Sequence, residues 1–313
     1  MTGYQALRSA AAWFDLGARG RIVVRGRDRA RLLHNLTSND VKQLAPGTAC
    51  YAFLLNAQGR IQADVTLLAF EDRFLLDTEP ELREKLPQHI RRYIIADQVE
   101  LEDVTAATTA IALEGPQAEQ VLEKTAAPVP AANYDHLPWS DFENATVARL
   151  SITAQPGFRV YCTAGSAGEI VRRLAAAGAV AAAAEDVRAV RVENGRPRYG
   201  DDIRDTSLPQ ETGQMRAVSF RKGCYLGQEI VERIRAQGHV NRKLVRLRLD
   251  SAVPAGTKLT AGDAEAGEVT SAAESPGASG ASALAYVRAG FAVPQQALCA
   301  GPVAATVTAL AGE

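Results

Sequence analysis

The chain has 313 residues, of which 47% are hydrophobic and 23% are charged, so it can form about two domains with full apolar cores. Its 35 lysines and arginines nearly balance 36 aspartates and glutamates, and this balance does not favour nucleic acid or a membrane as a partner. The longest apolar run, residues 174–184, is too short to cross a bilayer. The N-terminus lacks the pattern of a secretory signal, so we expect a cytoplasmic protein.

The cysteines lie far apart and form no CxxC pair, so neither a disulfide framework nor a structural zinc site is predicted. The four histidines show no ligand spacing, and we expect no metal site.

Two stretches of the N-terminal half share one pattern. Residues 21–41 and 110–129 each read as a strand, a glycine (Gly26, Gly115) and an amphipathic helix. Between them, residues 49–70 read as a hairpin that turns at "NAQG". This mixture predicts an α+β fold of internally duplicated, ferredoxin-like units.

In two more strand-to-helix units, a hydroxyl residue is predicted to cap the helix at the turn. They occupy residues 73–95 and 158–178, where Thr78 and Ser166 are predicted as helix N-caps.

Two carboxylates stand out by position. Asp64 lies mid-strand among apolar neighbours, where an unpaired charge is costly, so it either points outward or works inside a site. Glu193 precedes a glycine turn and could accept two parallel hydrogen bonds from a planar ligand such as a guanidinium or a pterin, or form an ordinary surface pair with an arginine.

The stretch "RKGCYLGQEIVERIRAQGHV" begins at residue 221 and places Cys224 between two glycines, just before a helix that starts at Gln228 and ends at Gly238. Adjacent Arg221 and Lys222 favour a reactive thiolate, although a buried structural cysteine is an equally open interpretation.

The sequence pattern changes after residue 240, where helical periodicity is lost and short strand patterns follow. The alternation in "KLVRLRLD" and the short strands that follow predict a small β-barrel or sandwich over residues 241–313, appended to an α+β region over residues 1–240. The basic residues between 221 and 248 could meet phosphates or a polycarboxylate tail, or simply form a solvated face.

Together with the motifs "GRDRARLLHNLTSNDV", "NAQGRIQADV", "VRVENGRPRYGDDI" and "AGEVTSAA", the sequence "KGCYLGQE" resembles the YgfZ-type folate-binding proteins. Their superfamily includes the aminomethyltransferase, or T-protein, of the glycine cleavage system. The resemblance implies a ring of three subdomains, with two interleaved α+β (ferredoxin-like or Greek-key) units and a C-terminal β-barrel. It also implies binding of tetrahydrofolate or another folate.

The resemblance also implies roles for individual residues. Glu193 falls on the pterin-binding glutamate, and Asp64 on an aspartate that lies near the reacting folate nitrogens of T-proteins. Lys222 is predicted to contact the folate, and Cys224 to be functional, as in YgfZ-type proteins.

Three functions follow as hypotheses. The first is a monomeric, folate-binding protein that supports assembly or repair of iron–sulfur clusters, with iron–sulfur enzymes or scaffold proteins as partners and tRNA-modifying radical enzymes among its clients. The alternative is an aminomethyltransferase of the glycine cleavage system, in which Asp64 assists proton transfer. An adaptor that binds RNA through the basic segment is the third, although we expect no direct nucleic-acid binding.

Overall fold

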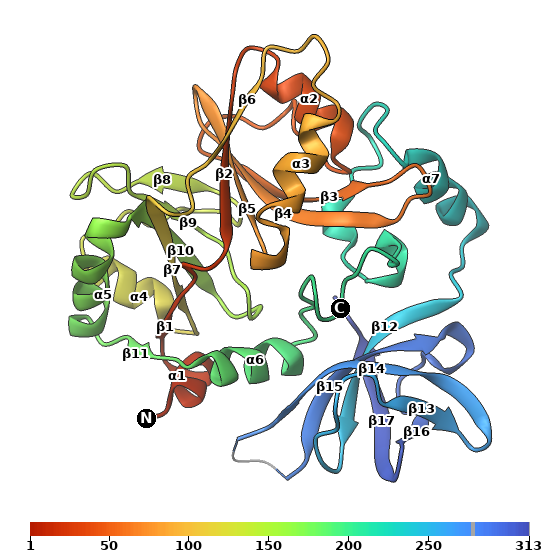
Figure 1. Ribbon diagram of the computed structural model, residues 1–313. Coiled ribbons are helices and arrows are strands. Elements are labelled where there is room, and N and C mark those ends of the chain that lie inside the picture. Colours follow the sequence, from red (N-terminus) through yellow and green to blue (C-terminus); the bar gives the residue numbers. More distant parts are fainter. Residues whose placement is uncertain (277–278, 313) are drawn as a thin grey trace.

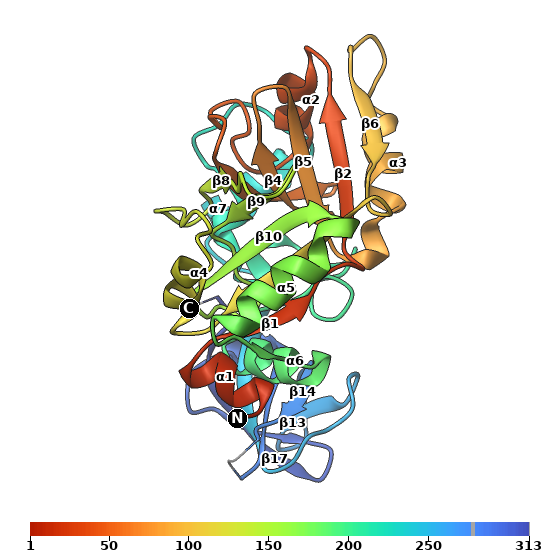
Figure 2. The same ribbon diagram turned by 90° about the vertical axis from the view of Figure 1, so that its left-hand side faces the viewer.

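The computed structural model describes residues 1–276 and 279–312, which form three units, each built on its own β-structure (Figure 1). The first unit is a five-stranded sheet of order β3-β4-β5-β2-β6, and the second is a six-stranded sheet of order β11-β1-β7-β10-β9-β8. The third is a closed barrel of order β12-β15-β14-β13-β16-β17. In the side view of Figure 2 the first sheet lies at the top, the second in the middle and the barrel at the bottom.

The strands of the first sheet are β2 (Gly20–Arg25), β3 (Ala49–Leu55), β4 (Ile61–Ala69), β5 (Arg73–Thr78) and β6 (Glu100–Asp103). Those of the second sheet are β1 (Ala12–Asp15), β7 (Thr108–Glu114), β8 (His136–Pro138), β9 (Thr146–Ala148), β10 (Gly157–Thr163) and β11 (Val180–Ala181). Those of the barrel are β12 (Arg242–Leu249), β13 (Lys258–Ala261), β14 (Ala264–Glu274), β15 (Ala281–Arg288), β16 (Ala297–Ala300) and β17 (Val303–Leu310).

The helices are mostly short. They are α1 (Gly3–Ser9), α2 (Arg29–Leu36), α3 (Lys85–Arg91), α4 (Ala118–Lys124), α5 (Ala167–Ala176), α6 (Ala184–Glu193) and α7 (Gln228–Gln237). Short 3-10 helices are η1 (Pro80–Leu82), η2 (Ala164–Ser166), η3 (Pro209–Glu211), η4 (Met215–Ala217) and η5 (Ala289–Phe291).

The first two units are interleaved along the chain. Strand β1 belongs to the second sheet, the chain then builds the first sheet from β2 to β6, and it returns to the second sheet at β7. After α6 the chain crosses back, so that Tyr199 and Val231 join the apolar core of the first sheet. This confirms the α+β class, the interleaving and the C-terminal barrel that the sequence predicts.

Both repeated units have the predicted strand, glycine and helix. Gly26 joins β2 to α2 with φ of 103°, and Gly115 joins β7 to α4 with φ of 131°. A Cβ atom on Gly26 would lie 2.0 Å from the carbonyl oxygen of Gln98, so no other residue fits there without backbone movement.

Neither of the two predicted N-cap side chains makes a capping hydrogen bond. Thr78 is the last residue of β5, and its hydroxyl donates to the carbonyl oxygen of Asp64 at 2.7 Å instead of capping a helix. This prediction was wrong because a cross-strand acceptor competes for the hydroxyl. Ser166 does precede α5, but its hydroxyl pairs with that of Thr163 rather than with a backbone N–H.

A buried ionic link joins the barrel to the interleaved units. The carboxylate of Asp202 is fully buried and accepts hydrogen bonds from Arg191 at 2.6 Å and from the hydroxyls of Thr270 and Ser271 on β14. These contacts fix the segment after α6 against the barrel.

Among residues 1–276 and 279–312, no helix is both long and apolar enough to cross a lipid bilayer. The same residues contain no group of three or more His, Cys, Asp or Glu side chains that could hold a metal ion.

Candidate functional site

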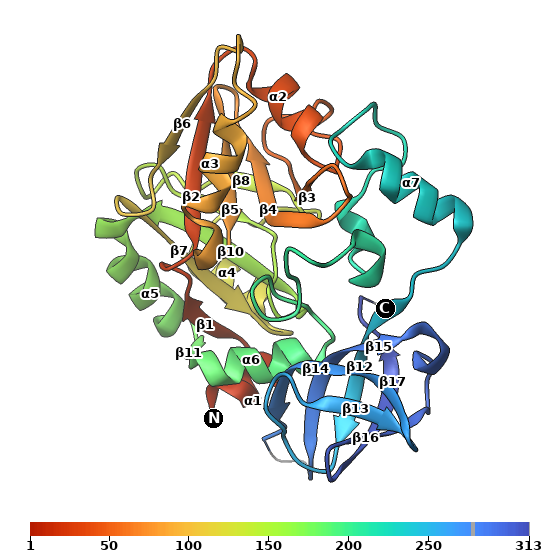
Figure 3. The same cartoon turned by 45° about the vertical axis from the view of Figure 1, so that its right-hand side comes forward.

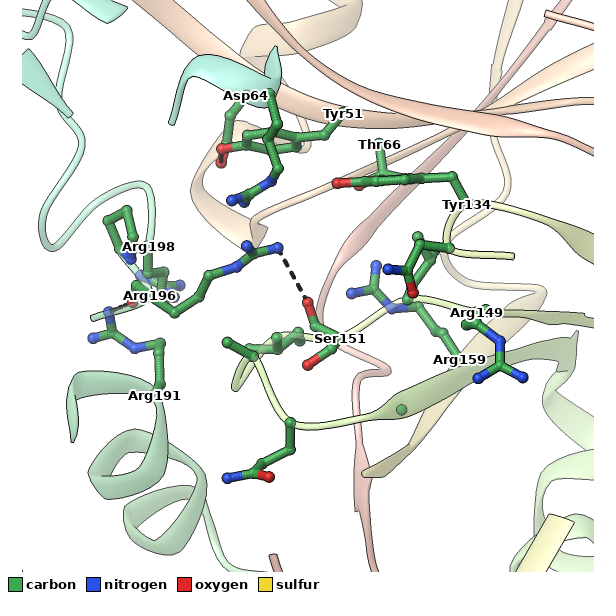
Figure 4. A pocket seen from close by; sticks show the side chains of 18 of the residues that line it. Tyr51, Asp64, Thr66, Tyr134, Arg149, Ser151, Arg159, Arg191, Arg196 and Arg198 are labelled. Atoms are coloured by element: carbon green, nitrogen blue, oxygen red, sulfur yellow. Dashed lines mark hydrogen bonds between the residues drawn. The ribbon is translucent and has the colours of Figure 1, made fainter. Parts of the chain in front are cut away.

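A cavity of about 520 Å³ opens where β3, β4 and the segment 196–198 meet the loop after β9 (Figure 4). Seven arginines and two acids, Asp64 and Glu79, line it together with the rings of Tyr51 and Tyr134. The volume falls within the range of small-molecule sites, and the excess of positive charge favours an anionic ligand.

Asp64 reaches this pocket because of strand periodicity. On β4, Asp64 and Thr66 point to the same face, and Tyr51 of β3 lies opposite Thr66 in the sheet register. The Tyr51 hydroxyl donates to Asp64 Oδ2 at 2.8 Å. Asp64 Oδ1 is buried and has no hydrogen-bond partner among the residues that the structure describes. An acceptor is therefore free on the pocket wall.

The protonation of Asp64 is tuned by its surroundings. Burial, followed by the negative charge of Glu79, raises the pKa of the Asp64 carboxyl to about 6, against the hydrogen bond from Tyr51. Burial and the charge of Asp64 raise the pKa of Tyr51 well above its ordinary value, so Tyr51 remains a donor. A carboxyl with a pKa near 6 can exchange protons near neutral pH.

A second buried acid, Asp77 of β5, holds two of the pocket arginines in place. Arg19 and Arg159 each donate to its carboxylate at 2.6 Å, and so does the Tyr161 hydroxyl. Burial alone would raise the pKa of Asp77, but Arg159 and Arg19 outweigh it and lower the pKa to about 2. Asp77 is not among the predicted site residues, although "FLLDT" carries the same signal as Asp64, an acid in an apolar strand.

The loop opposite Asp64 is fixed by Glu114, at the end of β7. Its buried carboxylate accepts from the Ser151 hydroxyl at 2.8 Å, from the Ile152 N–H at 2.6 Å and from both donor groups of Thr153. Ser151 and Ile152 line the pocket. Glu114 therefore holds this loop in place but does not itself line the pocket.

Glu193 lies at the end of α6 and is not among the residues that line the pocket. Both carboxylate oxygens accept from the Tyr4 hydroxyl, at 2.9 and 3.1 Å, and Arg8 lies 3.8 Å away. Its neighbours Arg191 and Arg196 do line the pocket. The role of Glu193 in holding a pterin stays a prediction, and it requires the carboxylate to exchange Tyr4 for the ligand.

Lys222 is a buried helix cap. Its ammonium donates to the carbonyl oxygens of His34, Thr37 and Asn39, at and just beyond the C-terminus of α2, and thereby uses all three of its donors. Burial lowers the pKa of Lys222 to about 8. The structure does not bring this residue to the pocket, and its predicted contact with folate stays untested.

Cys224 is exposed, while Tyr225 beside it is buried. Gly227, with φ of 82°, starts α7 as predicted, and a Cβ atom there would lie 2.5 Å from the carbonyl oxygen of Asn56. Figure 3 shows α7 at the edge of the molecule. The sequence "KGCYLGQE" is therefore anchored on both sides of an accessible thiol. Of the four predicted site residues, only Asp64 lines the pocket.

Three of the six basic residues between Cys224 and residue 248 are paired with acids. Arg233 pairs with Glu229, Arg235 with Glu232, and Arg242 with Glu211. These pairs give no support to an RNA-binding surface.

Replacement of Lys222 distinguishes a cap from a ligand contact. We expect Lys222→Met to lower the free energy of unfolding by about 2–4 kcal/mol, because three carbonyl oxygens lose a charged donor. Urea unfolding measures this loss, with Arg221→Met, an exposed neighbour, as the control. Unchanged stability combined with weaker folate binding would instead assign Lys222 to the ligand.

Comparison with known proteins gives the chain a consistent set of relatives. The GCVT N-terminal domain family matches residues 2–222, and the glycine cleavage T-protein C-terminal barrel domain family matches residues 242–310. An aminomethyltransferase of Rubrobacter xylanophilus is 33% identical over 290 residues, covering 91% of this chain and 78% of that protein. A putative chloroplastic transferase of Arabidopsis thaliana is 28% identical over 279 residues, covering 88% of this chain and 64% of that protein.

Among solved structures, the aminomethyltransferase T of the glycine cleavage system from Bartonella henselae has the same fold. The TM-score is 0.89 at 21% identity, and the match covers 99% of this chain and 88% of that chain.

Proposed function

The chain belongs to the glycine cleavage T-protein family, and on this premise we propose that it binds a reduced folate in the pocket and transfers a one-carbon unit between that folate and an amine. This is the reaction class of the aminomethyltransferases that it resembles. The observation that carries the proposal is the buried, unpartnered Oδ1 of Asp64 in an arginine-lined pocket. A cytoplasmic location is part of the proposal.

The residues of the pocket fit a folate. Tyr134 offers an aromatic ring to a flat pterin, and Arg149, whose acid partner Glu119 is exposed, can meet a carboxylate of the folate tail. The unpaired oxygen of Asp64, Oδ1, can accept a hydrogen bond from a folate nitrogen. These features favour a reduced folate over an uncharged ligand.

Tetrahydrofolate, when bound, supplies the reduced nitrogens that carry the one-carbon unit. Asp64 takes the proton that a reacting nitrogen loses, onto its free Oδ1. Tyr51 occupies Oδ2, so Oδ1 is the oxygen of Asp64 that remains without a hydrogen bond. Asp77 fixes the positions of Arg19 and Arg159 on the wall of the pocket.

Glu193→Gln tests the pterin contact that the resemblance implies. The substitution keeps the size but puts an amide donor against a ligand donor. If Glu193 holds the pterin, tetrahydrofolate affinity in calorimetry is expected to fall about 30- to 1000-fold with an unchanged melting temperature. Asp64→Asn is expected to cost less affinity. Unchanged affinity for Glu193→Gln would leave Glu193 as the partner of Tyr4 only.

The transfer reaction itself is tested by supplying one-carbon donors with tetrahydrofolate. An aminomethylated lipoyl carrier should release ammonia if the donor is that of the glycine cleavage system. Free N-hydroxymethyl amines, tested in parallel, should yield methylene-tetrahydrofolate, the free amine and water if the donor is a free molecule. Absence of transfer from every donor, with folate bound, would contradict a transferase.

A second candidate function is support of iron–sulfur cluster assembly or repair, with iron–sulfur enzymes or scaffold proteins as partners. The exposed position of Cys224, inside an otherwise anchored "KGCYLGQE" loop, favours it because a partner can reach the thiol.

Cys224→Ser tests this candidate in a strain that lacks the gene. We expect the variant to leave iron–sulfur enzyme activities at the deletion level, whereas Cys299→Ser, which alters another exposed thiol, should restore them. Full rescue by Cys224→Ser would remove the thiol from the function.

A further inference from the structure

Two arginines of the pocket differ from the rest in their charge balance. Five of the seven have a carboxylate partner: Arg19, Arg149, Arg159, Arg191 and Arg198. Arg196 and Arg216 have no carboxylate within 4.0 Å in the described part of the chain, residues 1–276 and 279–312. Among these residues, the two guanidinium groups are therefore not directly paired with a carboxylate.

These two arginines lie near Tyr51, the residue that donates to Asp64. The Arg216 guanidinium stacks 4.9 Å from the ring centre of Tyr51. Arg196 donates to the Ser151 carbonyl oxygen at 3.4 Å, and Figure 4 shows it reaching across the pocket toward Ser151, with Asp64 and Tyr51 on the facing wall. Burial, and next the like charge of Arg216, lower the pKa of Arg196. An anion between them would relieve both effects.

We propose that Arg196 and Arg216 together bind the carboxylate of a free, small amine of the amino-acid class, next to Asp64. This inference rests on the proposed function, because the amine would be the reaction partner of the folate.

The position of Arg196 and Arg216 favours binding of this amine over binding of the folate carboxylates. If Asp64 faces the reacting nitrogens, the aminobenzoyl group carries the folate carboxylates away from Asp64. Arginines at the Asp64 end then face the other reactant. A lipoyl arm does not fit them, because it is an uncharged alkyl chain and would leave both charges unpaired.

The test is calorimetry on the full chain, with and without saturating tetrahydrofolate. Glycine and N-methylglycine are the carboxylate probes, and methylamine is the matched probe without a carboxylate. We expect the wild type to bind the first two and not methylamine. Arg196→Gln and Arg216→Gln should each weaken that binding about 10- to 100-fold, since a charge-assisted hydrogen bond is lost. Arg25→Gln, which removes a surface charge paired with Glu102, should leave it unchanged.

Three outcomes would overturn the inference. If the two glutamine variants weaken tetrahydrofolate but not a tetrahydropterin that lacks the benzoylglutamate tail, the pair binds the folate tail. If they leave glycine binding unchanged, or release ammonia from a lipoyl carrier at the wild-type rate, the pair does not select the substrate. Absence of folate binding in the wild type would end the proposed function alone, because carboxylate binding that the variants lose would still support the site.

Discussion

Asp77→Asn is expected to lower the free energy of unfolding by about 3–5 kcal/mol, the largest stability effect of any single change considered for this protein. The carboxylate is fully buried and pairs with Arg19, Arg159 and the Tyr161 hydroxyl. Its replacement by a neutral amide leaves the buried guanidinium of Arg159 without a paired acid and leaves Arg19 with Glu79 alone. Urea unfolding at pH 7 measures the loss.

The pH dependence follows from the direction of the shift. The pKa of Asp77 is lowered to about 2 in the folded state, so its ionised form stabilises the fold above the unfolded pKa near 4. This contribution, about 2 kcal/mol, is lost as the pH falls from about 4 to 2. The variant should lack this part of the acid sensitivity. Asp72→Asn, which removes an exposed acid paired with Arg73, is the control. Equal stability of both variants would contradict the role of Asp77.

Asp64→Asn is expected to act in opposite directions on activity and stability. One-carbon transfer should fall about 100- to 10,000-fold, because an amide cannot take the proton. In the wild type the rate should decline below about pH 6, since only the ionised carboxyl accepts a proton and its pKa is about 6.

The stability of the same variant should rise at pH 7. Burial raises the folded pKa of Asp64 above its unfolded value near 4, so the ionised carboxyl destabilises the folded state above about pH 6. An uncharged isostere removes a penalty of roughly 1–3 kcal/mol at pH 7 and almost none at pH 4. Urea unfolding of both proteins at the two pH values measures the difference. A variant that keeps full activity, or gains no stability at pH 7, would contradict this account of Asp64.

Local signals in the sequence predict much of the fold. Gly26 and Gly115 mark strand-to-helix turns because their positive φ values suit glycine, and Gly227 and Gly238 bound α7 for the same reason. An acid in an apolar strand is costly, so Asp64 is predicted either to point outward or to work inside a site. The family resemblance implies the site role, and the structure places Asp64 in the pocket.

Other features depend on contacts between distant segments. Lys222 finds its carbonyl partners 183–188 residues earlier, and Glu193 meets Tyr4 across 189 residues. No local pattern distinguishes an arginine that pairs with an acid from Arg196, which has no acid partner among residues 1–276 and 279–312. The charge balance of the pocket is therefore visible only once the sheets and loops are assembled.

The most direct test of folate binding in this pocket is a crystal structure of the protein grown with tetrahydrofolate. We expect the folate in the cavity lined by Tyr51 and Tyr134, with Asp64 Oδ1 within hydrogen-bond distance of a folate nitrogen. A folate bound elsewhere on the molecule, or an empty pocket at saturating tetrahydrofolate, would contradict the proposed function.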